Sequence, residues 1–183
     1  LVRRQGFDGK LRAGRYMLRP NMTMGEIMAA LQTGIKIEEI QLTLIEGLRL
    51  EEIAAKVGAA GLPNVGEQAF LAAARDGAAF KNTHFRLNSL PPNASLEGYL
   101  FPDTYRIAST ATVTEVIEVL LSRFDEQYQT FETAVRVPDV DVHKIVTMAS
   151  IIQREATDPE EMGLISAVFW NRLKPENSGE FGG

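Results

Sequence analysis

The strongest constraint on this chain comes from the stretch MASIIQREATDPEE (148–161), which carries a carboxylate within an apolar helical face. At about 100° per residue, with Ile145 at zero, Met148 falls at roughly 300° and Ile151 at roughly 240°. Glu155 falls at roughly 280°, between these two apolar side chains. The sequence therefore predicts that Glu155 shares the apolar face of its helix.

Two effects act on a carboxylate at this position. Apolar neighbours desolvate its charged form, and the C-terminal end of the helix dipole disfavours a negative charge, so both raise the pKa. We expect Glu155 to stay protonated near neutral pH, as a general acid must before it donates to a leaving oxygen. A structural glutamate paired with an arginine is the alternative. Gln153 falls at roughly 80°, just outside the apolar arc, and Arg154 points away from it.

Composition excludes several classes of function. The chain has 183 residues, a net charge of -5 and no long basic run, which argues against nucleic acid as its main partner. It has no cysteine, and its two histidines are far apart, so no histidine-rich metal site is expected. No apolar run is long enough to span a membrane. Phosphate-loop, nucleophile-elbow and zinc-helix motifs are missing, and we expect no cofactor.

The N-terminal part alternates between predicted strands and helices. In chain order these are a strand (15–19), a helix capped by Thr23 and Glu26, a strand (39–45) and a helix (50–57). Residues 26–31 and 52–57 share a weak EI-x-A repeat. A pair of small binding modules or two unrelated amphipathic helices would both explain it.

The remaining predicted elements are mostly helical, so the fold class is α+β. They are a helix capped by Asn64 and Glu67, a polar loop (81–95), a strand-like aromatic segment (95–107), a helix capped by Thr112 and Glu115, a helix from Asp141 to Thr157, and a last helix capped by Asp158 with Met162, Ile165, Val168 and Phe169 on its buried face. The polar loop is expected to separate two regions, 1–80 and 81–183.

The segment SLEGYLFPDTYRI (95–107) holds a second candidate carboxylate, Glu97, beside aromatic residues. Such a combination often lines sugar clefts, because sugar rings stack on aromatic faces. The other interpretation is that the aromatic residues are alternating core positions of a strand. We favour it for Phe101 and leave Tyr99 open. Asp103 is expected to form a turn.

Three motifs in register resemble one family. LEGYLFPDTY (96–105), ASIIQREA (149–156) and VFWNRL (168–173) are similar to the motifs of the MltG/YceG-like endolytic murein transglycosylases. The segments GRYMLRPNMTMGEIMAALQTG (14–34) and IEGLRLEEIAAKV (45–57) look like that family's LysM-like region. The resemblance implies a small LysM-like βα module followed by a mostly helical catalytic domain with a short β-sheet.

The resemblance also implies a reaction. In that family one glutamate protonates the glycosidic oxygen between N-acetylmuramic acid and N-acetylglucosamine. It then helps the muramic 6-hydroxyl to attack, which leaves a 1,6-anhydro end. The catalytic position, the second acid of an E-[KR]-E pattern, is Glu155 here, and the first acid is replaced by Gln153. Glu97 matches the family's cleft-lining glutamate, and Tyr99 and Asn171 are the other expected substrate-binding residues.

A location and partners follow from the same resemblance. The substrate would be peptidoglycan strands, cell-wall synthesis proteins would be partners, and a membrane anchor would hold the enzyme on the outer face of the bacterial cytoplasmic membrane. We expect the chain to be a fragment that lacks this anchor and the C-terminal segment that completes the cleft.

Other functions stay open at this stage. A conventional glycoside hydrolase would use Glu97 and Glu155 as its two carboxylates. A non-catalytic peptidoglycan-binding protein would use the LysM-like modules alone. Some relatives carry the name aminodeoxychorismate lyase, but that reaction needs a pyridoxal phosphate lysine and a phosphate cup, and neither stands out.

Overall fold

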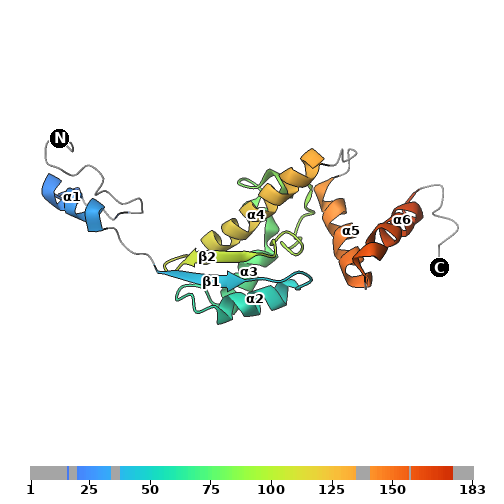
Figure 1. The fold of residues 1–183 in the computed structure, drawn as a ribbon, viewed down its shortest axis with the longest axis horizontal. Helices are drawn as coiled ribbons and strands as arrows, with labels where there is room; N and C mark the ends of the chain where they lie inside the picture. Colours follow the sequence, from blue (N-terminus) through green and yellow to red (C-terminus); the bar gives the residue numbers. More distant parts are fainter. Residues whose placement is uncertain (1–15, 17–19, 34–37, 135–140, 157, 175–183) are drawn as a thin grey trace. The chain divides into compact units, whose positions relative to one another are not determined.

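The computed structural model describes residue 16 and residues 20–33, 38–134, 141–156 and 158–174 (Figure 1). Two compact units make up the chain, Leu1–Glu38 and Glu39–Gly183. In the first, helix α1 (Met24–Thr33) begins with the predicted capping box: the Thr23 N–H donates to Glu26 Oε2 at 2.7 Å, and the Glu26 N–H donates to Thr23 Oγ1 at 3.3 Å. The strand predicted over 15–19 lies outside the described residues, apart from Tyr16.

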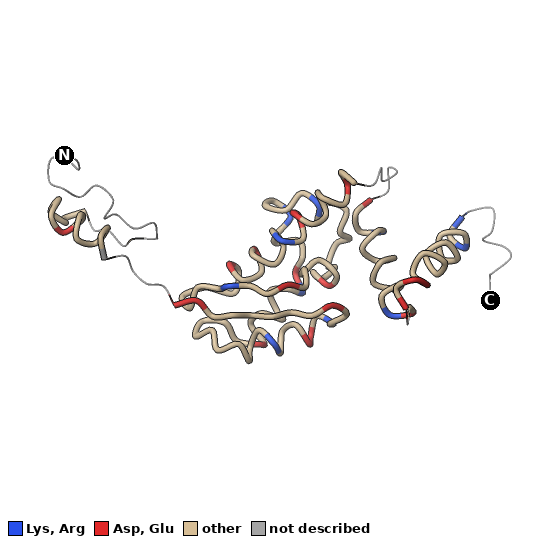
Figure 2. The backbone as a smooth tube through the Cα atoms, in the orientation of Figure 1, with Lys and Arg blue, Asp and Glu red and all other residues tan. Residues whose placement is uncertain are grey.

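The second unit is mostly helical with a two-stranded antiparallel sheet, which confirms the α+β class. Its elements are β1 (Glu39–Thr43), α2 (Leu50–Ala59), α3 (Glu67–Arg75), the 3-10 helices η2 (Gly77–Phe80) and η3 (Phe85–Ser89), β2 (Thr104–Ala108), α4 (Val113–Ala134), α5 (Val142–Glu155), the 3-10 helix η4 (Pro159–Glu161) and α6 (Met162–Arg172). Acidic and basic residues are interspersed along these elements (Figure 2). The LysM-like modules stay a prediction.

The sheet joins segments that lie far apart in the sequence. Leu42 pairs with Tyr105 and Ile40 with Ile107, so their side chains share one face of the ribbon. Leu42, Tyr105 and Ile107 are buried in one core with α2, α3 and α4. On the other face, the hydroxyls of Thr43 and Thr104 lie 3.1 Å apart. The alternation of buried and exposed residues therefore fixes the register of the two strands.

The structure divides the chain at residue 38, whereas the sequence suggested a boundary in the polar segment 81–95. That segment instead contains η3 and buries Leu87 and Leu90. Backbone hydrogen bonds tie its end to α3 and η2, from the Leu96 N–H to Ala74 O (2.8 Å) and from the Gly77 N–H to Ala94 O (3.2 Å). The division into 1–80 and 81–183 stays a prediction, but the polar segment holds two buried side chains, His84 and Arg86, whose partners lie outside it.

These partners lie on α4. Both ring nitrogens of the buried His84 face carboxylates: Nδ1 is 2.6 Å from Asp125 Oδ2, and Nε2 is 2.8 Å from Glu118 Oε2. The Arg86 guanidinium, also buried, donates to Glu132 Oε2 at 2.6 Å and to Asp125 Oδ1 at 3.5 Å. Burial of these two side chains is tolerated because each faces carboxylates, although Arg86 Nε is buried with no hydrogen-bond partner among the described residues. The network thus fastens segment 81–95 to α4.

Side-chain caps begin some of the helices. The Thr112 and Glu115 box before α4 is present, with the Thr112 N–H donating to Glu115 Oε2 at 2.8 Å. Asp141 caps α5 through the Lys144 N–H at 2.8 Å. The cap predicted at Asn64 is wrong, because the N-cap of α3 is Gly66 and the Asn64 amide donates to Thr110 O.

The apolar face predicted for the last helix is also wrong as a buried face. Asp158 does cap η4, accepting from the Glu160 N–H at 2.9 Å. Among the described residues, however, none in α6 is buried: of the predicted face, Met162, Ile165 and Phe169 are half-buried and Val168 is 42% exposed. In this structure α6 packs mainly against α5 and η4.

Gly98 marks a close approach between the segment after η3 and α5. Its φ is +84°, and a Cβ there would lie 2.6 Å from Val146 Cγ1. Gly61 has a similar φ of +82°, but a Cβ there would have no atom within 4 Å.

Gly61→Ala should lower the free energy of unfolding by about 1–2 kcal/mol through backbone strain alone. Gly98→Ala should lose about 1–3 kcal/mol more, because α5 must shift. Urea unfolding of both variants measures the difference. Equal losses of unfolding free energy would show that α5 can shift without destabilising the protein.

Asp125→Asn tests the buried network. It neutralises the carboxylate shared by His84 and Arg86, and we expect the free energy of unfolding to fall by about 2 kcal/mol or more. Glu126→Gln is the matched control, since it removes an exposed charge one residue away and should change stability by less than about 0.5–1 kcal/mol. Chemical denaturation compares them. Similar losses in the two variants would mean that the network contributes only as surface charges do.

Candidate functional site

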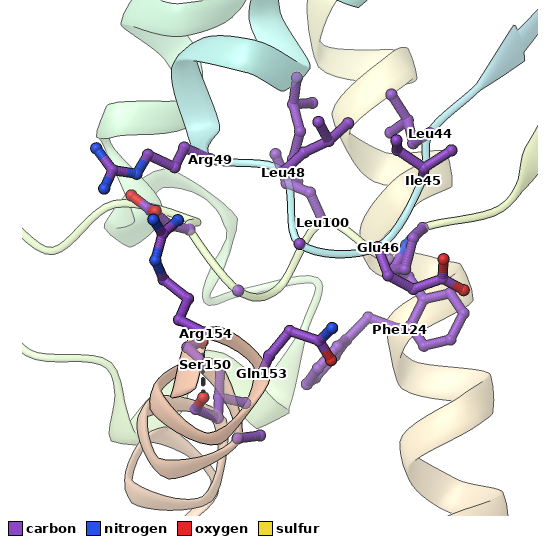
Figure 3. Close-up of a pocket in the computed structure, with 18 of the residues that line it drawn as sticks. Leu44, Ile45, Glu46, Leu48, Arg49, Leu100, Phe124, Ser150, Gln153 and Arg154 are labelled. Carbon is purple, nitrogen blue, oxygen red and sulfur yellow. Dashed lines mark hydrogen bonds between the residues drawn. The ribbon is translucent and has the colours of Figure 1, made fainter. Parts of the chain in front are cut away.

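One cleft of about 490 Å³ lies in the second unit (Figure 3). Five segments form it: the β1–α2 connection, α2, the segment following η3, α4 and α5. The lining side chains and backbone belong to Leu44, Ile45, Glu46, Gly47, Leu48, Arg49, Ile53, Glu97, Gly98, Leu100, Phe101, Pro102, Phe124, Tyr128, Phe131, Ile145, Val146, Ala149, Ser150, Gln153 and Arg154. Most are apolar, so the cleft offers an apolar floor with a few polar groups.

The polar groups come from both walls. Glu46 and Arg49 belong to the β1–α2 connection, and Ser150, Gln153 and Arg154 belong to the last turns of α5. The Ser150 hydroxyl donates to Val146 O at 2.9 Å and is therefore committed to its own helix. Hydrogen bonds to a ligand would come chiefly from carboxylate, amide and guanidinium groups.

Two of the predicted site residues meet in this cleft. Glu97 and Gln153 both line it, although they are far apart in the sequence. Asn171 lies exposed in the last turn of α6 and does not line the cleft.

Glu155 lies elsewhere on the same helix. It is the last residue of α5, it is exposed, and it is not part of the cleft lining. Gln153 and Glu155 are two residues apart, which separates them by about 200° around a helix. The predicted apolar enclosure of Glu155 is therefore not found among the described residues. The cleft faces the other side of α5, which presents Ile145, Ala149 and Gln153.

Tyr99 belongs to the core rather than to the cleft surface. Its side chain is fully buried, and its ring centroid lies 5.1 Å from that of Phe124. Its hydroxyl lies 3.2 Å from Nδ1 of His143, on α5. Burial, with a smaller contribution from the charge of Asp141, raises the pKa of Tyr99 to about 12. The phenol therefore stays neutral and holds α5 against the core.

Phe101 and Asp103 follow the sequence interpretation in part. Phe101 is half-buried against the core but also lines the cleft. Asp103 forms the predicted turn: it accepts from the Thr104 N–H at 2.7 Å and from Arg123 Nε at 2.7 Å, and both bonds lower the pKa of its carboxyl. Asp103 is thus a structural carboxylate.

Sequence reasoning missed three charged residues of the cleft: Glu46, Arg49 and Arg154. The signal for Arg154 was present, because it falls off the apolar arc of α5 on the side that proves to face the cleft. Glu46 precedes Gly47, whose φ of +78° marks a tight turn before α2. Only the tertiary fold reveals that this turn faces α5.

Known relatives cover most of this chain. The endolytic murein transglycosylase of Streptococcus pneumoniae serotype 2 (strain D39) is 31% identical over 180 residues, which are 89% of this chain and 33% of the relative. The one of Bacillus subtilis (strain 168) is 31% identical over 185 residues, 94% of this chain and 50% of the relative. A crystal structure of a yceG-like protein from Listeria monocytogenes has a TM-score of 0.64 at 28% identity, covering 94% of this chain and 59% of that one.

These relatives define a class of proteins named for acting on murein. The sequence profile of the YceG-like family matches residues 1–178, and the chain belongs to that family. It spans between about a third and a half of the length of these curated relatives. Among the described residues, no helix is long and apolar enough to cross a membrane, and no group of three or more potential metal ligands occurs.

Tyr99→Phe gives a pH-dependent prediction. The unfolded phenol ionises near pH 10.0, whereas the pKa of the folded one is raised to about 12. The stability from the neutral phenol is therefore complete below pH 10 and is lost as the pH rises toward about 12. At neutral pH, the free energy of unfolding of the variant should be about 1 kcal/mol lower than that of the wild type, because the hydrogen bond of the Tyr99 hydroxyl is lost. Above pH 10, the stability of the variant should fall less steeply with pH than that of the wild type, because it has no phenol to ionise. Urea unfolding from about pH 7 to pH 11 measures both; parallel pH profiles would contradict it.

Proposed function

We propose that this chain carries the catalytic part of an endolytic lytic transglycosylase that cleaves peptidoglycan between N-acetylmuramic acid and N-acetylglucosamine. The observation that carries the proposal is the match of the YceG-like family profile to residues 1–178, with relatives named endolytic murein transglycosylases. A cleft with an apolar floor and polar rim supports it, because sugar rings have apolar faces and hydroxyl edges.

Glu155 is the proposed general acid and base. Its carboxylic acid donates a proton to the glycosidic oxygen as the bond from that oxygen to the muramic C1 breaks. The Glu155 carboxylate then takes the proton from the 6-hydroxyl of that muramic sugar, while the 6-oxygen forms a bond to C1 of the same sugar. The products are a free hydroxyl on one fragment and a 1,6-anhydro end on the other. The carboxyl returns to its starting state, and no water is consumed.

The cleft residues would position the strand for this reaction. Glu97 and Gln153 would hydrogen-bond sugar hydroxyl and acetamido groups, and Gln153 provides an amide where the family pattern has a carboxylate. Asn171 would contact the strand beyond the end of α5. The LysM-like region is proposed to bind further sugar units, and the active protein to work with cell-wall synthesis proteins at the outer face of the cytoplasmic membrane.

One observation favours a second candidate. Glu97 lines the cleft, whereas Glu155 lies on the other side of α5. A glycoside hydrolase could use Glu97 directly on the bound sugar, with Glu155 as the second carboxylate. The two reactions differ in their products, because water attack leaves a reducing end and intramolecular attack leaves an anhydro end.

Mass spectrometry of digested peptidoglycan tests the proposal. Wild-type protein should produce 1,6-anhydro ends, and Glu155→Gln should lower their rate of formation by about 1,000-fold or more while the circular dichroism spectrum stays unchanged. Glu97→Gln should lower the rate by about 10–100-fold and still yield anhydro ends.

Three results would contradict this assignment. Anhydro ends formed equally by the Glu155→Gln variant would remove Glu155 from its role. Reducing ends carrying oxygen from labelled water would establish the hydrolase. Binding of glycan strands with no cleavage by the wild type would make this chain a binding protein.

A further inference from the structure

We propose that Arg49 and Arg154 form a carboxylate-binding rim that reads the peptide stem of the glycan strand. This inference rests on the proposed function, since it assumes that the cleft holds peptidoglycan. It assigns a specificity role to two cations of the cleft that the transglycosylase chemistry leaves unused.

The two arginines come from opposite walls of the cleft. Arg49 is exposed in the β1–α2 connection, and Arg154 is exposed in the last turn of α5. Figure 3 shows both side chains extending along the same side of the cleft, whereas Glu46 lies on the opposite side, near Phe124. The labelled side chains therefore place two cations on one side of the cleft and Glu46 across from them, and Glu97 is a second acid of the lining.

Neither guanidinium has an ion pair with the part of the chain that the structure describes. The acid beside Arg49, Glu51, is hydrogen-bonded at 3.1 Å to Arg75 instead, and the charge of Arg49 makes only a minor contribution to its lowered pKa. Glu97 lines the same cleft without pairing to either arginine. Two like charges on one rim repel each other, and a bound anion would relieve that repulsion.

Local helix stability explains one of the two cations but not the other. Arg154 lies at the C-terminal end of α5, where a positive charge is favourable. Arg49 is the N-cap of α2, where a positive charge opposes the helix dipole. The Arg49 N–H donates to Glu52 Oε2 at 2.8 Å as part of the capping box of α2, and this bond is made by the backbone, so it does not require an arginine side chain.

The chemistry of the strand identifies the anion. The sugars of a peptidoglycan strand are uncharged except through the lactyl group of the muramic residue, which carries a peptide with free carboxylates. A sugar whose face lies on the apolar floor would direct that substituent toward the rim. Guanidinium groups bind carboxylates with two parallel hydrogen bonds, which makes arginine better suited than lysine to this recognition.

The test uses a soluble tetrasaccharide–peptide fragment of peptidoglycan and the same fragment with its carboxylates converted to carboxamides. All proteins carry Glu155→Gln, so that binding is measured without cleavage. The native fragment should bind about tenfold more tightly than the amidated one. Adding Arg49→Gln or Arg154→Gln should each weaken binding of the native fragment by about tenfold and change that of the amidated fragment by less than about twofold.

Arg75→Gln and Arg106→Gln are the matched controls, because each removes one positive charge outside the cleft. Both should leave the two affinities unchanged. Equal affinity for the two fragments, or equal weakening of both by the cleft variants, overturns the inference. Product analysis with Glu155 intact tests the proposed function separately. Carboxylate-dependent binding without anhydro products would support the arginine rim and contradict the transglycosylase reaction. Anhydro products without carboxylate-dependent binding would support the reaction and contradict the rim.

Discussion

The seating of Tyr99 in the core is the interaction on which the cleft depends. Its ring packs against Phe124 of α4, and its hydroxyl meets His143 of α5. The backbone N–H of His143 also donates to the Ser89 hydroxyl at 3.1 Å. Helix α5 buries only Val146 and Met148, so it has little apolar area of its own to fix its position. These few polar and aromatic contacts therefore fix the position of α5, which forms one wall of the cleft.

The opposite wall is held by a different kind of interaction. The β1–α2 connection follows a strand whose register is set by pairing with β2, and α2 buries four residues in the main core. This wall is thus rigid, while the α5 wall is attached more lightly.

Local signals in the sequence were sufficient for the α-helices and for β1, because caps such as Thr112 with Glu115 and alternation such as that around Leu42 are short-range effects. They placed β2 only in part, since the predicted strand-like segment was 95–107 and the strand is Thr104–Ala108. They failed where partners come from far away. Segment 81–95 looked like a linker because it is polar. Its histidine and arginine are buried against carboxylates of α4, which are remote in the sequence. The sequence singled out Glu97 and Gln153, which line the cleft, but it did not single out Arg49. Its place in the cleft depends on how two walls meet.

The position of Glu155 shows why an apolar arc is an incomplete guide to a site. The arc correctly placed Glu155 and Gln153 on different sides of α5, but the side facing the cleft is that of Gln153. On the proposed chemistry, the strand must therefore reach both sides of the helix end. Ala156 leaves the helix in an extended conformation, so the backbone turns away directly after Glu155. A long glycan strand that crosses this end could contact Gln153 within the cleft and Glu155 beyond it. A short sugar confined to the cleft would not reach the proposed catalyst, which favours cleavage within long strands.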